Sequence, residues 1–321
     1  MGNGSRNRLE YENRVNRVID YIQAHRAEPL SLESLAQVAA FSPFHFHRVF
    51  KSITGENLRE FVQRVRLEWA GSMLSQRPHV EVIEIALDSG FQSASAFARA
   101  FKEHFGMTAT AWRGGGTKQW SKLRMADSKP GQADSKPGEA EGCQERHPVS
   151  RRGSPPASEK EDTMNVSVKT LPPCRLAYMR HVGPYGAGSS VPQLWQRMQR
   201  WAAARELWTP ERLCLGMAHD DPHVTAPEKC RYDAAIAIAA DFQPDAQVNV
   251  IDLSGGRFAV APFEGTGFDI AASWDRLFAD WLPVSGYQPD EGPYIERYHG
   301  EAFDERTGVV KCELCLSVKP L

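Results

Sequence analysis

The chain has 321 residues, 41% of them apolar, and a formal net charge of -2 at pH 7, which is a globular composition with room for two domains. It has no apolar run near the roughly 20 residues that span a bilayer, and its first residues lack the apolar stretch of a signal peptide. We therefore expect a cytoplasmic protein that does not insert into membranes.

Charge is spread unevenly along the chain. Residues 1–124 hold 17 Lys and Arg against 12 Asp and Glu, whereas residues 164–321 hold 15 against 20. The first part can approach a polyanion that the second part would repel. A contact with nucleic acid is therefore expected in the first part.

The first part of the chain contains a helical repeat. After an amphipathic stripe over residues 15–22, the segment SLESLAQVAAFSPFHFHRVFKSITG matches VIEIALDSGFQSASAFARAFKEHFG with a shift of 50 to 51 residues. The aligned pairs include Ala36 with Ala86, Phe50 with Phe101 and Gly55 with Gly106. Each copy predicts a helix, a tight turn and a second helix, with Ser42 and Ser93 as N-caps of the second helices. A helix-turn-helix therefore occurs twice in an all-α domain.

The second helix of each copy has a face that can meet DNA. In SPFHFHRVFKS the remaining apolar positions can pack inward, which leaves Phe44, His47, Arg48 and Lys51 on the outside. About 20 residues of helix, or roughly 30 Å, separate the two copies, which suits two major-groove faces about 34 Å apart. Double-stranded DNA is the partner that this spacing predicts.

Residues 114–163 have a different composition, dominated by Gly, Pro, Ser and mixed charge, with DSKPG present twice. Such a segment cannot bury enough apolar surface to order itself. It predicts a flexible linker between a domain of residues 1–113 and a domain of residues 164–321. We expect that the two domains need not share a fixed interface.

The last part of the chain repeats with strand alternation. VKTLPPCRLAYMRHVG matches VIDLSGGRFAVAPFEG at a constant shift of 82, and each copy is followed by an amphipathic helix and two more strands. The unit is βαββ, twice, which predicts an α+β domain with pseudo-twofold symmetry. The seam between the halves is a natural cleft.

One carboxylate stands among aromatic residues in the strand PYIERYHG. Strand alternation puts Tyr294, Glu296 and Tyr298 on one face, with Arg297 on the other. An isolated carboxylate between tyrosines is costly unless it is paired, so Glu296 indicates a binding site rather than a solvated surface. In CELC, Cys312 and Cys315 point to opposite faces and cannot share a metal, and we predict neither a metal site nor a cofactor.

The first 113 residues resemble the double helix-turn-helix domain of the AraC/XylS transcription regulators. The closing family pattern F-x-R-x-F-K-x-x-x-G is matched here by Phe97, Arg99, Phe101, Lys102 and Gly106. The resemblance implies promoter DNA and RNA polymerase as partners. It implies base-facing positions at Phe44, His47 and Arg48, and at Ala94, Ser95, Ala96 and Arg99. Because residues 94–96 are short, base readout by the second helix is expected to rest on Arg99 and on DNA shape.

In one place the chain departs from that family. The family usually has Pro where this chain has Ala109. We expect the helix to begin there nevertheless, because Thr108 can cap it.

Residues 164–321 resemble the GyrI-like effector-binding domain. The resemblance rests on HVGPY, RYDAAI, GGRFAVAPFEGT, PYIERYHG and CELCLSV, in that order. It implies that Glu296 faces an aromatic cleft between the two halves. The side chains expected around it are Tyr294, Tyr298, Tyr185, Trp195 and Trp274. The tryptophans also lie on apolar helix stripes, where a core position is the alternative.

Three functions are compatible with these features. The leading one is a transcription regulator whose second domain binds a small aromatic effector. This effector can be a cation, because the carboxylate of Glu296 can pair with a positive charge. The second is hydrolysis of reactive, cyclopropane-bearing molecules, known for some GyrI-like proteins, with Glu296 and Tyr298 activating water. The third is constitutive regulation with a vestigial sensor. The DNA-binding domain favours sensing, so we do not expect an enzyme.

Overall fold

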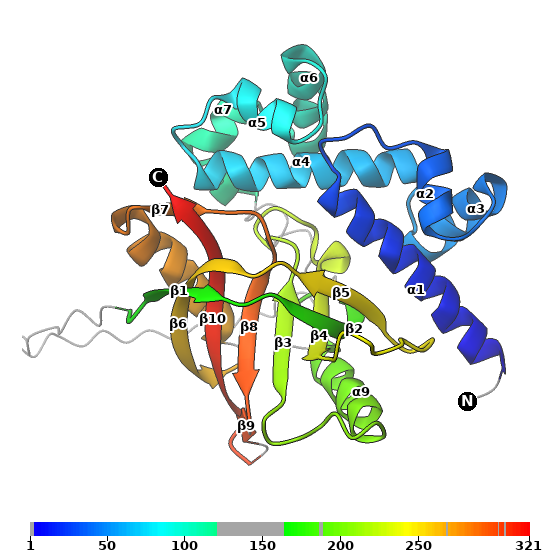
Figure 1. The fold of residues 1–321 in the computed structure, drawn as a ribbon. Helices are drawn as coiled ribbons and strands as arrows, with labels where there is room; N and C mark the ends of the chain where they lie inside the picture. The colour runs from blue at the N-terminus through cyan, green and yellow to red at the C-terminus, as the bar shows by residue number, and fades with distance from the viewer. Residues whose placement is uncertain (1–2, 121–163, 186–188, 268, 301, 305) are drawn as a thin grey trace, which may run out of the picture.

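The computed structural model describes residues 3–120, 164–185, 189–267, 269–300, 302–304 and 306–321. Figure 1 shows a helical first domain lying on a second domain built around one curved sheet, which confirms the predicted fold class. Among the described residues, no helix combines the length and the apolarity needed to cross a bilayer. The linker predicted for residues 114–163 falls outside the described residues from position 121 onward.

The first domain contains both predicted helix-turn-helix units. Its helices are α1 (Asn3–Ala24), α2 (Leu32–Val38), α3 (Pro43–Thr54), α4 (Leu58–Gln76), α5 (Val82–Asp88), α6 (Ala94–Phe105), α7 (Ala109–Ala111) and η1 (Trp112–Gly116). The pairs α2–α3 and α5–α6 are the two units, and α4 joins them (Figure 1).

The ends of these helices follow from local signals. Ser42 and Ser93 each accept a hydrogen bond from the backbone N–H three residues on, which confirms both predicted N-caps. α3 and α6 end at Gly55 (φ 75°) and Gly106 (φ 71°), where only glycine adopts the left-handed conformation without strain. Thr108 caps α7 by accepting from the N–H of Ala111 at 3.2 Å, as expected.

The first domain extends further than its sequence predicts. Residues 114–120, expected to belong to the linker, form helical turns on both sides of a kink at Gly115, which has φ 109°. The reason is Trp120, whose ring packs edge-on against Phe105 at 5.3 Å and whose indole N–H donates to the carbonyl of Val224 at 3.4 Å. The contacts of this one partly buried aromatic residue thus tie a Gly-rich segment to both domains.

The second domain is a mainly antiparallel sheet with helices on one face. Its elements are β1 (Ser167–Leu171), β2 (Cys174–Val182), α9 (Val191–Ala203), β3 (Leu213–Ala218), η2 (Pro227–Lys229), β4 (Arg231–Ala237), β5 (Asn249–Leu253), β6 (Gly256–Thr266), α10 (Asp269–Arg276), η3 (Leu277–Trp281), η4 (Leu282–Val284), β7 (Tyr287–Pro289), β8 (Tyr294–His299), β9 (Phe303–Asp304) and β10 (Val309–Pro320). The strand order is β1-β6-β10-β8-β3-β4-β2-β5, and β7 and β9 also pair with β10.

Both βαββ repeats are present, as β2-α9-β3-β4 and β6-α10-β8-β10. Each is preceded by one more strand, β1 or β5, which the sequence pattern merged with the next strand. Turns at Pro172–Pro173 and at Ser254–Gly255 separate these strands, and Gly255 has φ 69°. β1 pairs with β6 and β5 pairs with β2, so the first strand of each repeat is hydrogen-bonded to a strand of the other repeat. β3 and β8 pair at the centre of the sheet.

The two faces of the sheet have different coverings. Helix α9 packs on the face that carries Ala177, Cys214 and Tyr232. On the other face the sheet curls, and its edge strands β1 and β5 run in front of the central strands (Figure 1). Cys312 and Cys315 lie in the cores of opposite faces, as the alternation predicts.

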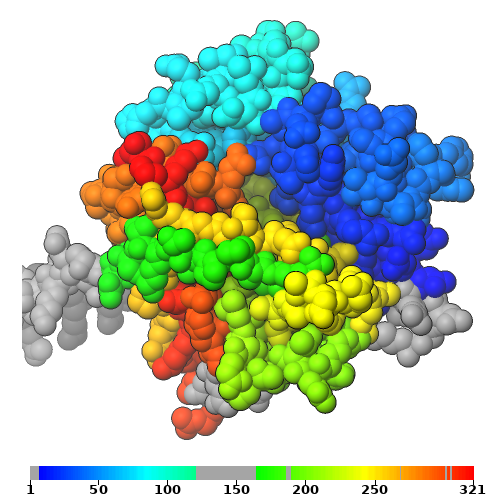
Figure 2. All heavy atoms as spheres, viewed as in Figure 1, coloured from blue at the N-terminus to red at the C-terminus, as the bar shows by residue number. Residues whose placement is uncertain are grey.

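The two domains share an interface, which corrects the expectation that no fixed contact is needed. Helix α1 lies across β2 and β5, where Asn13 donates to the carbonyl of Ala246 at 2.9 Å. At the end of α4, Gln76 donates to the hydroxyl of Tyr294 at 2.9 Å and Arg77 to the carbonyl of Pro289 at 2.9 Å. Figure 2 shows the blue and cyan helical residues lying directly against the yellow, orange and red residues of the second domain.

The interface also has an apolar part. Val224, from the second domain, is 1% exposed and belongs to the same core as Leu67, Phe105 and Trp112 of the first domain. The composition of residues 114–163 could not reveal this contact, because linker sequence reports on the connection and not on the surfaces that it connects.

Candidate DNA interface and effector site

The first candidate recognition helix, α3, has one buried and one exposed face. Phe46 and Phe50 are fully buried, which fixes the orientation of the helix. Phe44 is 70% exposed, and the guanidinium of Arg48 lies 5.9 Å from the centre of its ring. The structure places all four predicted side chains on the exposed face: Phe44, His47, Arg48 and Lys51.

The second candidate recognition helix, α6, is built in the same way. Phe97, Phe101 and Phe105 are buried beneath it. The predicted contact residues are again exposed: Ala94, Ser95, Ala96 and Arg99. Only Arg99 is long enough to reach far into a groove.

The spacing of the two helices is set by α4, whose 19 residues span about 28 Å at 1.5 Å per residue. The second domain docks against α1 and the end of α4, and it leaves the eight predicted DNA-contacting residues exposed. Docking therefore does not cover the faces that are predicted to contact DNA.

Glu296 lies at the centre of the sheet, on the seam between the two repeats. It stands on β8 directly opposite Gly216 of β3, and only 7% of it is exposed. The hydroxyls of Tyr232 and Tyr298 each donate to its Oε2 at 2.7 Å. The indole N–H of Trp195 donates in turn to the Tyr232 hydroxyl at 3.3 Å.

Gly216 is required by this close packing. A Cβ at this position would lie 2.6 Å from Oε2 of Glu296 and closer still to the hydroxyl of Tyr232. No side chain can therefore replace glycine without displacing the carboxylate or its donor.

Burial dominates the electrostatics of the site. It raises the pKa of Glu296, and the hydrogen bonds from Tyr298 and Tyr232 offset part of that rise. It also raises the pKa of both tyrosines well above the ordinary value, with the Glu296 charge adding to the effect. No described Lys, Arg or His side chain forms an ion pair with Glu296. The site is thus a buried acid held by two neutral donors.

The other predicted aromatic residues form two groups. Trp195 packs edge-on against Tyr298 at 5.3 Å, and Tyr185 lies 6.3 Å from Tyr232, with its hydroxyl donating to the carbonyl of Arg231 at 2.7 Å. Trp195 and Tyr185 thus pack against the two tyrosines that bind the carboxylate.

Tyr294 and Trp274 form the second group, with ring centres 5.3 Å apart. The Tyr294 hydroxyl accepts from Gln76 of the first domain rather than binding Glu296. This pair therefore joins the core beneath α10 to the domain interface.

Two residues of the site were missed by the sequence analysis, Tyr232 and Gly216. Tyr232 lies in the segment RYDAAI and shares a sheet face with Ala234 and Ile236. Alternation places it on a face, but only the strand order brings β4 beside β3 and thus near Glu296. Nothing in the local sequence marks Gly216.

A separate cavity of about 140 Å³ lies on the opposite face of the sheet. Its lining includes Leu171, Leu213, Leu215, Ile295 and Arg297. Ile295 and Arg297 flank Glu296 along β8 and point away from it. This cavity is therefore not part of the Glu296 site.

Comparison with known proteins identifies both domains. Residues 164–319 match the GyrI-like small molecule binding domain, and residues 35–115 match a helix-turn-helix domain. YosT, an SPbeta prophage-derived protein of Bacillus subtilis (strain 168), is 30% identical over 156 residues, which is 49% of this chain and 100% of YosT.

Two further relatives cover different shares of the chain. The right origin-binding protein of Escherichia coli (strain K12) is 24% identical over 322 residues, covering 95% of this chain and 98% of that protein. The DNA gyrase inhibitor of Edwardsiella piscicida is 32% identical over 139 residues, which is 42% of this chain and 86% of the inhibitor.

Fold, exposed recognition helices and buried acid together define a DNA-binding protein with a small-molecule binding domain. The chain belongs to the family of transcription regulators that join an AraC-type helix-turn-helix domain to a GyrI-like domain. These matches support regulation over the hydrolase alternative.

Proposed function

We propose that this regulator binds promoter DNA through α3 and α6 and responds to a small aromatic cation bound at Glu296. It acts in the cytoplasm and contacts RNA polymerase, with residues 121–163 as the tether between its domains. The observation that carries the effector part is the buried Glu296 carboxylate, which has two tyrosine donors at 2.7 Å.

The DNA part rests on side-chain exposure and chemistry. Arg48 can pair with two acceptors of a guanine edge, and the 70% exposed ring of Phe44 is suited to a thymine methyl group. On α6, Arg99 supplies the one long donor, so readout there depends more on DNA shape. Lys51 and His47 complete the exposed face of α3.

The effector part rests on the cost of an uncompensated buried charge. In a site of low polarity each charge interaction is stronger than in water, so a cation gains much by approaching Glu296. The faces of Trp195 and Tyr298 add cation-π attraction. A neutral aliphatic molecule gains neither contribution.

Isothermal calorimetry on the full chain tests the effector site with two matched flat probes, N-methylquinolinium, a cation, and quinoline, which is neutral at pH 7. The wild type should bind the cation more tightly than quinoline. Glu296→Gln keeps the shape of the side chain and removes its charge, so it should weaken binding of the cation by about 1.5 kcal/mol or more, the lower end of the range for close charge pairs.

Glu264→Gln is the control, because Glu264 pairs with Lys311 at the surface of the same domain, 62% exposed. It should leave both affinities unchanged. Equal binding of the cation to the wild type and to Glu296→Gln would contradict the proposed site.

A further inference from the structure

Strand β4 has one side chain at the effector site and two at the domain interface. Tyr232 points to the face of Glu296, while its neighbours Arg231 and Asp233 point to the opposite face. All three are buried, at 5%, 4% and 0% exposure. These three successive residues of β4 thus link the Glu296 site on one face of the sheet to the domain interface on the other.

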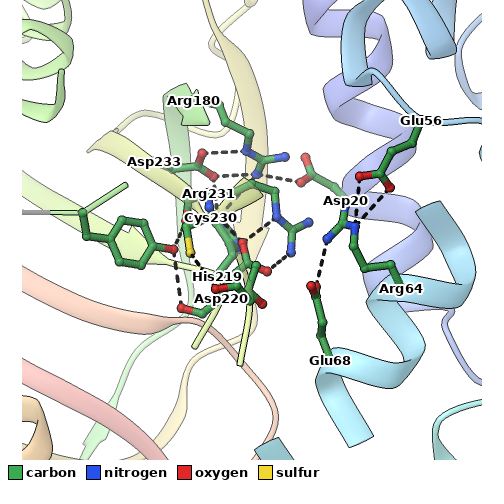
Figure 3. A network of polar contacts seen from close by, with 12 residues as sticks. Asp20, Glu56, Arg64, Glu68, Arg180, His219, Asp220, Cys230, Arg231 and Asp233 are labelled. Carbon is green, nitrogen blue, oxygen red and sulfur yellow. Dashed lines mark hydrogen bonds and ion pairs between the residues drawn. The ribbon is translucent and has the colours of Figure 1, made fainter. Parts of the chain in front are cut away.

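Asp233 leads directly to the DNA-binding domain (Figure 3). Its two carboxylate oxygens each accept from the Arg180 guanidinium at 2.7 Å, and His219 Nε2 lies 2.6 Å from one of them. The same guanidinium is 2.8 Å from Asp20 of α1. The Tyr178 hydroxyl also donates to Asp20. One side chain, Arg180, therefore joins β4 to α1.

Arg231 reaches the interface in parallel. Its backbone N–H and its Nε each donate to Asp220 Oδ2 at 2.8 Å. In the amide orientation that gives both groups a partner, the side-chain oxygen of Gln23 on α1 accepts from Arg231 at 2.7 Å. Asp220 and Arg231 also act electrostatically on Glu68 of α4. The network thus contacts α1 directly, and its charges act on Glu68 of α4.

We propose that β4 couples ligand binding at Glu296 to the strength of the contact between the second domain and α1. This inference rests on the proposed function, in which a cation pairs with Glu296. Both tyrosine hydroxyls bind the same oxygen, Oε2 of Glu296, and the coupling requires that the ligand take the place of the Tyr232 hydroxyl there. β4 is paired on both sides, with β2 and β3, so a shift of residue 232 moves residues 231 and 233 with it.

The buried ion pairs make the interface sensitive to such a shift. A buried charge is stabilised only while its partners keep good geometry, so a small displacement of Asp233 or Arg231 weakens the contact with α1. The effector then favours a looser interface. Because coupling is reciprocal, loosening the interface at Asp20 must favour effector binding by the same factor.

Calorimetry on the full chain with N-methylquinolinium measures this reciprocity. Asp20→Asn and Tyr178→Phe should each tighten binding by about five-fold or more, the lower end of typical coupling. Asn13→Ala is the control, since Asn13 lies on the same helix and interface but contacts Ala246 and Asn249, which are off β4. It should change the affinity less than two-fold.

A second measurement needs no ligand. Tyr232→Phe removes a donor to Glu296 without touching the interface, and it should raise amide hydrogen exchange in residues 13–24 by about five-fold or more. If the probe fails to bind any variant, the proposed ligand class is wrong, and this exchange measurement decides the coupling alone. Unchanged exchange in Tyr232→Phe, or binding that Asp20→Asn and Tyr178→Phe leave unchanged or weaken, overturns the proposal.

Discussion

Glu68 should make the stability of the folded chain fall as the pH rises toward neutrality. Its side chain is 8% exposed and accepts from Arg64 at 2.8 Å. Burial raises its pKa from the ordinary 4.5 to about 7, with Arg64 and Arg231 acting against the rise and Asp220 adding to it. A difference of this size corresponds to about 3 kcal/mol between the protonated and the charged form.

The sign follows from proton binding. Between pH 4.5 and 7 the folded chain holds the Glu68 proton more tightly than the unfolded chain does. The stabilisation is thus fully present below pH 4.5 and is lost as the pH rises through about 7. Glu68→Gln cannot titrate, so other groups cancel when the two proteins are compared.

Urea unfolding followed by tryptophan fluorescence, at pH values from 5 to 8, gives the free energy of unfolding of the wild type and of Glu68→Gln. The wild type should lose about 2–3 kcal/mol relative to the variant over this range. Curves that run parallel from pH 5 to 8 would refute the reasoning, because Glu68 would then titrate alike in both states.

Three other outcomes are expected. Arg48→Ala should cost about 1–3 kcal/mol of binding to the specific promoter in fluorescence anisotropy, and equal affinities would remove α3 from base readout. In a set of mutated operators, base changes under α6 should cost less than those under α3, because residues 94–96 are short; equal sensitivity would contradict the contact assignment. A protease site inserted between residues 121 and 163 should, once cut, give two pieces that co-elute in size-exclusion chromatography. Val224→Asp should separate the two pieces, because it places a charge in the core that the domains share. Separation of the pieces in the wild type would contradict the interface.

The helices and most of the strands could be predicted because their signals are local. Ser42 and Ser93 mark helix starts, Gly55 and Gly106 mark helix ends, and apolar periodicity supplies the buried faces. The edge strands β1 and β5 were missed because a two-residue turn hardly interrupts strand alternation. Their exchange between the repeats depends on the whole sheet and leaves no mark on either segment.

The domain interface could not be predicted because its contacts join single residues far apart in the chain. Asp20 meets Arg180, and Val224 enters a core of aromatic residues more than 100 positions earlier. Neither has a periodic pattern around it. Glu296 could be singled out as a candidate because alternation isolates it among tyrosines, whereas Tyr232 and Gly216 require the pairing of β4, β3 and β8 to be known.

The most direct test of the account is a crystal structure of the full chain grown with N-methylquinolinium. We expect the cation beside the Glu296 carboxylate, against Trp195, with the Tyr232 hydroxyl displaced from its 2.7 Å contact with that carboxylate. A cation bound in the cavity lined by Leu215 and Arg297, with the bonds from Tyr232 and Tyr298 to Glu296 intact, would contradict it.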